Sequence, residues 1–183
     1  RWWLQKGLHQ GIVTVNGSWP DQPNHIYSFP NPCLTSEELR EGQLEIHRKT
    51  LQQPVQLLFI GRLETPKGAG RVLEIASLLA STGVDFQLKM IGDGPERQTY
   101  ELLINKLALN DKVELLGWLP KTELTNYYSQ AHFLLLPSTA SEGWPKVLSE
   151  GMAYGVVPLA GAGSSIPQIL AESQAGLALL PDQ

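Results

Sequence analysis

Two glutamates stand eight positions apart in the stretch SEGWPKVLSEG, residues 141–151, on either side of a Gly-Trp-Pro-Lys turn. Pro145 suits the first position of a helix, so backbone amides from Gly143 onward lack helical carbonyl partners and can face an anion. Glu142 then precedes the helix and Glu150 lies on its second turn. Ionised carboxylates accept hydrogen bonds and cannot donate them, so the natural partners of this pair are the vicinal hydroxyls of a sugar or ribose. A helix cap and a surface charge are the alternative explanation.

Two cations follow the apolar run at residues 55–61, within the stretch GRLETPKGAG. Arg62 comes directly after this run, and Lys67 lies at the start of the next helical pattern. We expect both at a rim where ligands bind, although solvated surface charges are the alternative. The stretch lacks Gly-Lys-Ser/Thr, which argues against a triphosphate loop of the Walker type.

Two glycine pairs begin like a dinucleotide fingerprint, GDGPER at 92–97 and GAGSSI at 161–166. Both lack the third glycine, so neither is good evidence for a nicotinamide cofactor. Gly92 and Gly94 would still let the backbone approach a ligand closely at a helix N-terminus, with Pro95 at the first helical position. A simple tight turn explains the pair equally well.

Composition excludes several classes of function. The net charge of −4 and pI near 5.6 argue against nucleic acid as a partner. We expect no metal, because Asp-x-Asp is absent and the four histidines lack ligand spacing: His9, His25, His47 and His132. Cys33 is the single cysteine, which excludes a disulfide framework and fits a reducing compartment. No Gly-x-Ser-x-Gly elbow of a hydrolase occurs, and no apolar run approaches the roughly 20 residues that cross a bilayer.

Strand-length apolar runs alternate with helical patterns from residue 55 onward, and these elements must position the residues above. The strands are expected at 55–61, 85–92, 113–119, 132–138, 156–161 and 177–180, and the helices at 67–82, 95–109, 121–130, 145–154 and 165–172. Short connections and right-handed crossovers predict an α/β fold with a Rossmann-like doubly wound parallel sheet. Ligands bind such sheets outside the carboxyl ends of the strands.

Residues 1–54 lack this alternation. They contain two strand-like runs, at 11–15 and 25–29, and Thr35 with Glu38 forms the signature of a capping box that opens a helix. We interpret 1–54 as the end of a neighbouring domain and a hinge, and 55–183 as the sheet domain. The chain begins at Arg1 without methionine and is expected to be a fragment.

Taken in order, the motifs resemble the C-terminal, donor-binding domain of GT-B fold retaining glycosyltransferases. The resemblance covers roughly residues 55–183 and includes the E-x7-E motif of that family at Glu142 and Glu150. Residues 10–54 resemble the end of the acceptor domain and the hinge. The other matching residues are Gly61, Arg62, Leu63, Lys67 and Gly68, then Gly92–Pro95, Leu115–Trp118, Leu136–Ser138 and Gly143.

The resemblance implies a role for each site residue. Arg62 and Lys67 would hold the donor diphosphate and offset the charge that builds on the leaving phosphate. Glu150 would accept hydrogen bonds from the ribose hydroxyls, while Glu142 would orient the transferred sugar. The remaining donor-binding residues would be Gly143 and Trp144 through their amides at the sugar, Gly61, Gly92 and Gly94 at the close approach, and Gly117 and Trp118 at the nucleobase.

The resemblance also implies the reaction. A UDP-, GDP- or ADP-sugar would donate its sugar with retention of anomeric configuration and without a metal or cofactor. The acceptor, a sugar, lipid or other molecule, would bind the missing N-terminal domain, so this fragment alone would bind nucleotide without turnover. A non-catalytic nucleotide or phospho-ligand module is the alternative, and a nicotinamide oxidoreductase is disfavoured. We expect a cytoplasmic protein, with peripheral attachment to the inner face of the membrane left open.

Three positions depart from the family pattern. Gly151 follows Glu150 where alanine is usual, which costs about 1 kcal/mol of helix propensity. Gln168 replaces a carboxylate in the loop after 156–161. At the hinge, Asn31-Pro32 stands where Asn-Gly is frequent. These departures bear on donor choice, whereas the diphosphate and hydroxyl contacts are expected to be intact.

Overall fold

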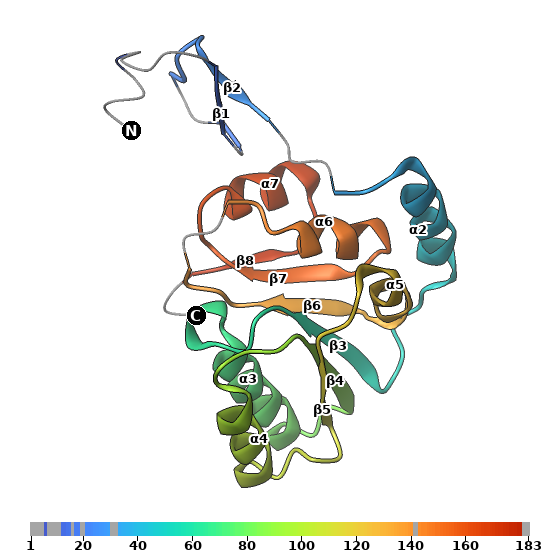
Figure 1. Ribbon diagram of the computed structural model, residues 1–183. Helices are drawn as coiled ribbons and strands as arrows, with labels where there is room; N and C mark the ends of the chain where they lie inside the picture. The colour runs from blue at the N-terminus through green and yellow to red at the C-terminus, as the bar shows by residue number, and fades with distance from the viewer. Residues whose placement is uncertain are drawn as a thin grey trace.

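The computed structural model describes residues 6, 12–15, 17–18, 21–29, 33–140 and 143–180. Its centre is a six-stranded sheet in the order β5-β4-β3-β6-β7-β8 (Figure 1), in which every pair of neighbours is parallel. The strand order reverses between β3 and β6, so the predicted doubly wound sheet is confirmed. The strands are β3 (Val55–Ile60), β4 (Phe86–Ile91), β5 (Val113–Gly117), β6 (Phe133–Leu136), β7 (Val157–Gly161) and β8 (Leu177–Leu179).

Helices connect the strands in the predicted alternation. Figure 1 shows α3 and α4 beside the β3–β5 half of the sheet, and α6 and α7 beside the β6–β8 half. Because parallel crossovers are right-handed, the reversal of strand order puts the helices of the two halves on opposite faces. The helices are a short 3-10 helix, η1 (Thr65–Lys67), followed by α3 (Ala69–Ser81), α4 (Arg97–Lys106), α5 (Lys121–Gln130), α6 (Lys146–Ala153) and α7 (Ile166–Ser173).

The core lies along the central strands. Leu58 and Phe59 of β3 and Leu134 of β6 are each at most 1% exposed. Strands covered on both faces need apolar side chains on both, which is why these segments read as continuous apolar runs. The carboxyl ends of β3 and β6 therefore have a rigid base.

The two prolines that were predicted at first helical positions both lie before the helix. Pro145 is the N-cap of α6, and its ψ of 124° is extended, so helical geometry begins only at Lys146. Pro95 lies in a turn, and α4 begins at Arg97.

The N-terminal part contains a separate parallel pair, β1 (Val13–Val15) and β2 (Ile26–Ser28), followed by α2 (Ser36–Arg48). The predicted capping box is confirmed: Glu38 N donates to Thr35 Oγ1 and Thr35 N donates to the Glu38 carboxylate. Helix α2 packs on α5 and α6. Within the described part of the chain, no helix is both long and apolar enough to cross a membrane.

Candidate functional site

Three glycines join the carboxyl ends of β3, β4 and β5. Gly61 N donates to Ile91 O at 3.0 Å, and Gly92 N donates to Gly117 O at 2.8 Å. Gly92 has a φ of 134°, and a Cβ there would lie 1.9 Å from Gly61 O. The glycines thus allow one loop to approach another closely. This packing of the loops requires glycine even without a ligand. Their predicted closeness to a ligand stays a prediction.

The loop after β4 also locks onto the loop after β3. Leu63 N donates to Asp93 O at 3.0 Å, and a Cβ on Gly94 would lie 2.5 Å from Leu63 O. Glu96 braces the pair by accepting from Thr65 Oγ1 at 2.8 Å and Tyr100 Oη at 2.5 Å. The hydrogen bond from Tyr100 is the main cause that lowers the pKa of Glu96. The two loops therefore form one platform.

The predicted cations lie on this platform beside the point where the strand order reverses. Arg62 has a side chain that is 66% exposed, and its Nε lies 3.5 Å from Glu64 Oε2. Lys67 closes η1 and is half-buried. Pro66 O accepts from Thr139 N at 2.9 Å, which holds η1 against the loop after β6. The structure therefore positions both cations at the carboxyl edge.

The aromatic and glycine residues of the predicted site differ in exposure. Trp118 follows β5 and is 73% exposed, so its indole is accessible to a ligand. Trp144 folds over the start of α6, where its Nε1 donates to Ser149 Oγ at 2.6 Å. Gly143 is exposed just before α6. Glu142 lies outside the described residues, so its predicted contact with a sugar stays a prediction.

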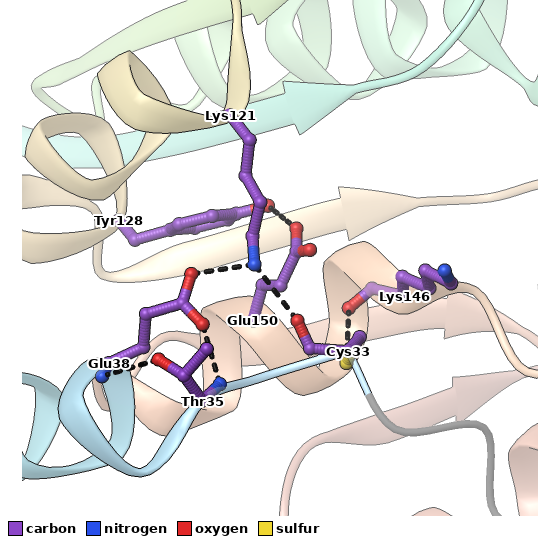
Figure 2. Close-up of polar contacts among 7 residues, drawn as sticks. All are labelled: Cys33, Thr35, Glu38, Lys121, Tyr128, Lys146 and Glu150. Atoms are coloured by element: carbon purple, nitrogen blue, oxygen red, sulfur yellow. Dashed lines mark hydrogen bonds and ion pairs between the residues drawn. The ribbon is translucent and has the colours of Figure 1, made fainter.

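Glu150 is a buried carboxylate and not a surface charge. The residue is 7% exposed, and its Oε2 accepts a hydrogen bond from Tyr128 Oη at 2.9 Å (Figure 2). Burial, and then the charge of Glu150, raise the pKa of Tyr128 far above its ordinary value of 10.0, so the hydroxyl remains a donor. Among the contacts of described residues, the partner of Glu150 is thus a tyrosine of α5 and not a cation of the β3 loop.

An ion pair flanks this carboxylate. Lys121 Nζ, at the start of α5, lies 2.6 Å from Glu38 Oε1 and donates to Cys33 O at 2.9 Å. The hydrogen bond with Glu38 is the largest cause that raises the pKa of Lys121, and the charge of Glu150 adds to it. Sequence reasoning found neither Lys121 nor Tyr128 as a site residue. The spacing of Leu124 and Tyr128 indicates only a buried face of α5, because contacts between α5 and α6 leave no local pattern.

The departures from the family pattern have structural contexts. A Cβ on Gly151 would lie 3.3 Å from Leu134 Cδ2 and 3.7 Å from Tyr128 Cδ1. Gln168 joins α7 to the N-terminal segment: its Nε2 donates to Ser18 Oγ at 2.8 Å, and its Oε1 accepts from Ser18 N at 3.2 Å. An ionised carboxylate could not donate to Ser18 in this way. Asn31-Pro32 lies outside the described residues.

Two further observations concern ligands. In the part of the chain that the structure describes, no group of three or more His, Cys, Asp or Glu side chains gathers as a metal site. A groove of about 630 Å³ opens between α3 and the ends of β6–β8. Among the described residues, none of the predicted donor-binding residues lines this groove, whose polar lining includes Arg71, Glu74 and Ser138.

A doubly wound parallel sheet with cations and glycines on its carboxyl-edge loops, and a buried carboxylate on the following helix α6, defines a Rossmann-like domain. The model of one family, "Glycosyl transferases group 1", matches residues 43–183. The chain therefore belongs to the glycosyl transferases group 1 family.

Individual relatives agree with this assignment. The chain is 32% identical over 134 residues to the amylovoran biosynthesis glycosyltransferase AmsK of Erwinia amylovora, covering 70% of this chain and 33% of AmsK. It spans about a third of the length of the first curated relatives that it matches.

Solved structures confirm the GT-B type of fold. The C-terminal domain of a glycosyl transferase group 1 family protein, LpcC from Francisella tularensis, has a TM-score of 0.62 at 19% identity, covering 77% of this chain and 75% of that domain. HepE from Anabaena, solved in complex with UDP, has a TM-score of 0.62 at 15% identity, covering 82% of this chain and 40% of HepE.

Proposed function

We propose that this chain is the donor-binding part of a glycosyltransferase that moves a sugar from a nucleotide-diphosphate sugar to an acceptor. The observation that carries the proposal is Glu150, a carboxylate that is 7% exposed and that accepts, among the described residues, one hydrogen bond on Oε2. A buried charge is costly unless it is hydrogen-bonded, so a group retained in this state is a candidate for binding. Ligand hydroxyls would supply the remaining hydrogen bonds.

Other residues at the carboxyl edge of the sheet suit the diphosphate, the sugar and the nucleobase of such a donor. Arg62 and Lys67 would hold the diphosphate, and Glu142 with the amides of Gly143 and Trp144 would orient the sugar. The nucleobase would lie near Gly117 and Trp118, whose indole is 73% exposed. HepE, which shares the fold, was solved with UDP, and this supports a uridine donor as the first to test.

The mechanistic part of the proposal is retention without a metal. The cations of the β3 loop would offset charge on the leaving diphosphate, the task that a divalent metal performs in other transferases. We infer retention from the resemblance to the E-x7-E family. NMR of the product measures its anomeric configuration and so tests retention. An inverted product would contradict this part alone.

The binding test is a thermal-shift panel of UDP, GDP, ADP and NAD, each with EDTA and with Mg²⁺. A nucleoside diphosphate at 100 times its dissociation constant should stabilise the chain by about 2.7 kcal/mol, with or without Mg²⁺. Glu150→Gln should weaken the binding of that nucleotide by about 1.5–3 kcal/mol, the scale of a lost charge-assisted hydrogen bond. Calorimetry measures this difference in binding free energy. Glu172→Gln, at an exposed position of α7, is the matched control and should leave the affinity for the nucleotide unchanged.

Three outcomes would contradict the proposal or a part of it. An unchanged dissociation constant for Glu150→Gln would remove the ribose role, and stabilisation by NAD alone would favour an oxidoreductase. Nucleotide binding by the complete protein without sugar transfer to any acceptor would point to the non-catalytic alternative.

A further inference from the structure

The carboxylate of Glu150 has two oxygens in different situations. Oε2 accepts from Tyr128 Oη at 2.9 Å, across the contact between α5 and α6. Oε1 accepts no hydrogen bond from any residue that the structure describes, yet it is not among the fully buried polar atoms that lack a partner. The residue as a whole is 7% exposed. Tyr128 therefore holds one oxygen, and the other is left without a hydrogen bond from the described residues.

The tyrosine that fixes Oε2 is itself held firmly. Its residue is 2% exposed, and its ring stacks on Tyr154 with centroids 6.1 Å apart and planes at 19°. Gly151, the neighbour of Glu150 on α6, leaves space on another side of the ring. An alanine Cβ at 151 would make an ordinary contact with Tyr128 at 3.7 Å and would lie 3.3 Å from Leu134 Cδ2, so Leu134 would have to move slightly.

The electrostatic surroundings of Glu150 include a cation that has partners of its own. Lys121 Nζ, drawn in Figure 2, is already engaged by Glu38 Oε1 at 2.6 Å and by Cys33 O at 2.9 Å. Its charge reaches Glu150 without a hydrogen bond between them. Figure 2 also shows that the Tyr128 hydroxyl approaches the carboxylate from the α5 side, away from Cys33 and Lys146.

We propose that Tyr128 is the positioning residue of the nucleotide site: its hydroxyl binds Oε2 of Glu150 and so directs Oε1 toward the ribose hydroxyls of the donor. This inference rests on the proposed function, because it needs Glu150 to meet the ribose. The inference adds Tyr128, a residue of α5 that lies outside the motif containing Glu150. The effect of Tyr128 would be confined to the recognition of ligand hydroxyls.

The test compares UDP with 2′,3′-dideoxyuridine diphosphate, which lacks both ribose hydroxyls, by calorimetry. Tyr128→Phe removes only the donating hydroxyl. It should raise the dissociation constant of UDP 3- to 10-fold and change that of the dideoxy compound by less than twofold. The preference for the ligand with ribose hydroxyls should then be largely lost. Tyr127→Phe, one residue earlier on α5, is the control and should preserve both affinities.

A merely structural role would give a different pattern. Equal weakening of both ligands by Tyr128→Phe, or no weakening of either, would overturn the positioning role. Glu150→Gln separates this failure from that of the proposed function: if Glu150→Gln keeps the preference for ribose, the ribose assignment itself fails. If Glu150→Gln abolishes the preference and Tyr128→Phe keeps it, only the inference about Tyr128 fails.

A spectroscopic measurement on the unaltered sequence covers the case in which Tyr128→Phe does not fold. The chain labelled with ¹³Cζ-tyrosine should show one resonance that moves both on addition of UDP and in Glu150→Gln. If UDP does not change the chemical shift of this resonance, the proposal is overturned. If UDP changes the chemical shift and dideoxyuridine diphosphate does not, the proposal is supported.

Discussion

Gly92 shows how strictly single residues are constrained at the carboxyl edge. Its φ of 134° is a conformation that side chains rarely adopt, and its Cα lies against the backbone of Gly61. The sequence motif indicates a glycine turn for a ligand, whereas the structure reveals a second demand from the neighbouring loop. Both demands can act on the same residue, because the loop that Gly92 touches carries Arg62.

Gly92→Ala should destabilise the chain by at least about 3 kcal/mol, through backbone strain and the collision with Gly61 O. Gly83→Ala is the control, because Gly83 has a φ of 77° but open space around it. It should cost only about 1–2 kcal/mol. Urea denaturation measures both, and equal losses would show that the contact with Gly61 does not matter.

Helix α2 shows how local sequence signals and long-range contacts combine in one element. The capping box of Thr35 and Glu38 is readable from four residues and is present. The second partner of the Glu38 carboxylate, Lys121, is far along the chain and could not be predicted. This pair connects α2 to α5 beside Glu150.

The hydrogen bond from Lys121, and then that from Thr35, lower the pKa of Glu38 below 4.5, and Glu38 raises the pKa of Lys121 above 10.5. The pair therefore stabilises the fold between these values and is lost as pH falls through the lowered carboxyl pKa or rises through the raised lysine pKa. Glu38→Gln keeps an acceptor for the capping box but loses the ion pair.

Glu38→Gln should cost about 0.5–1 kcal/mol at pH 7, the scale of a partly exposed ion pair. The difference from the unaltered chain should shrink at pH 3, because this lies below the ordinary carboxyl pKa of 4.5 and the unfolded chain is then stabilised by a proton that folding must release. Glu37→Gln, in the same helical turn, serves as the reference for a general charge effect. A difference that is equally large at pH 3 and pH 7 in urea denaturation would contradict the ion-pair explanation.

The arrangement of whole elements decides which segments form one unit. Helix α2 lies before the predicted boundary at residue 55, yet it packs on α5 and α6 at close range. A Cβ on Gly42 would lie 2.1 Å from Ala153 O, so the two helices touch through backbone. The family model likewise begins inside α2, at residue 43.

Gly42→Ala should push α2 away from α6 and lower the free energy of unfolding by about 1–3 kcal/mol, as overpacking does elsewhere. Gln43→Ala, at the next and exposed position, should stay within about 0.5 kcal/mol. If Gly42→Ala leaves the urea midpoint unchanged while α2 becomes sensitive to protease, α2 is not part of the cooperative unit of the sheet.

The sequence by itself determined the order and type of the strands and α-helices from residue 55 onward, since apolar periodicity, glycine turns and caps are local properties. It also located Arg62, Lys67 and Glu150 beside strand ends or on the following helix. Only the tertiary structure decided that Gly92 lies against Gly61 and that Glu150 is paired with Tyr128, 22 positions away. Such contacts depend on how helices and loops from different parts of the chain pack, and packing leaves no periodic trace in any one segment.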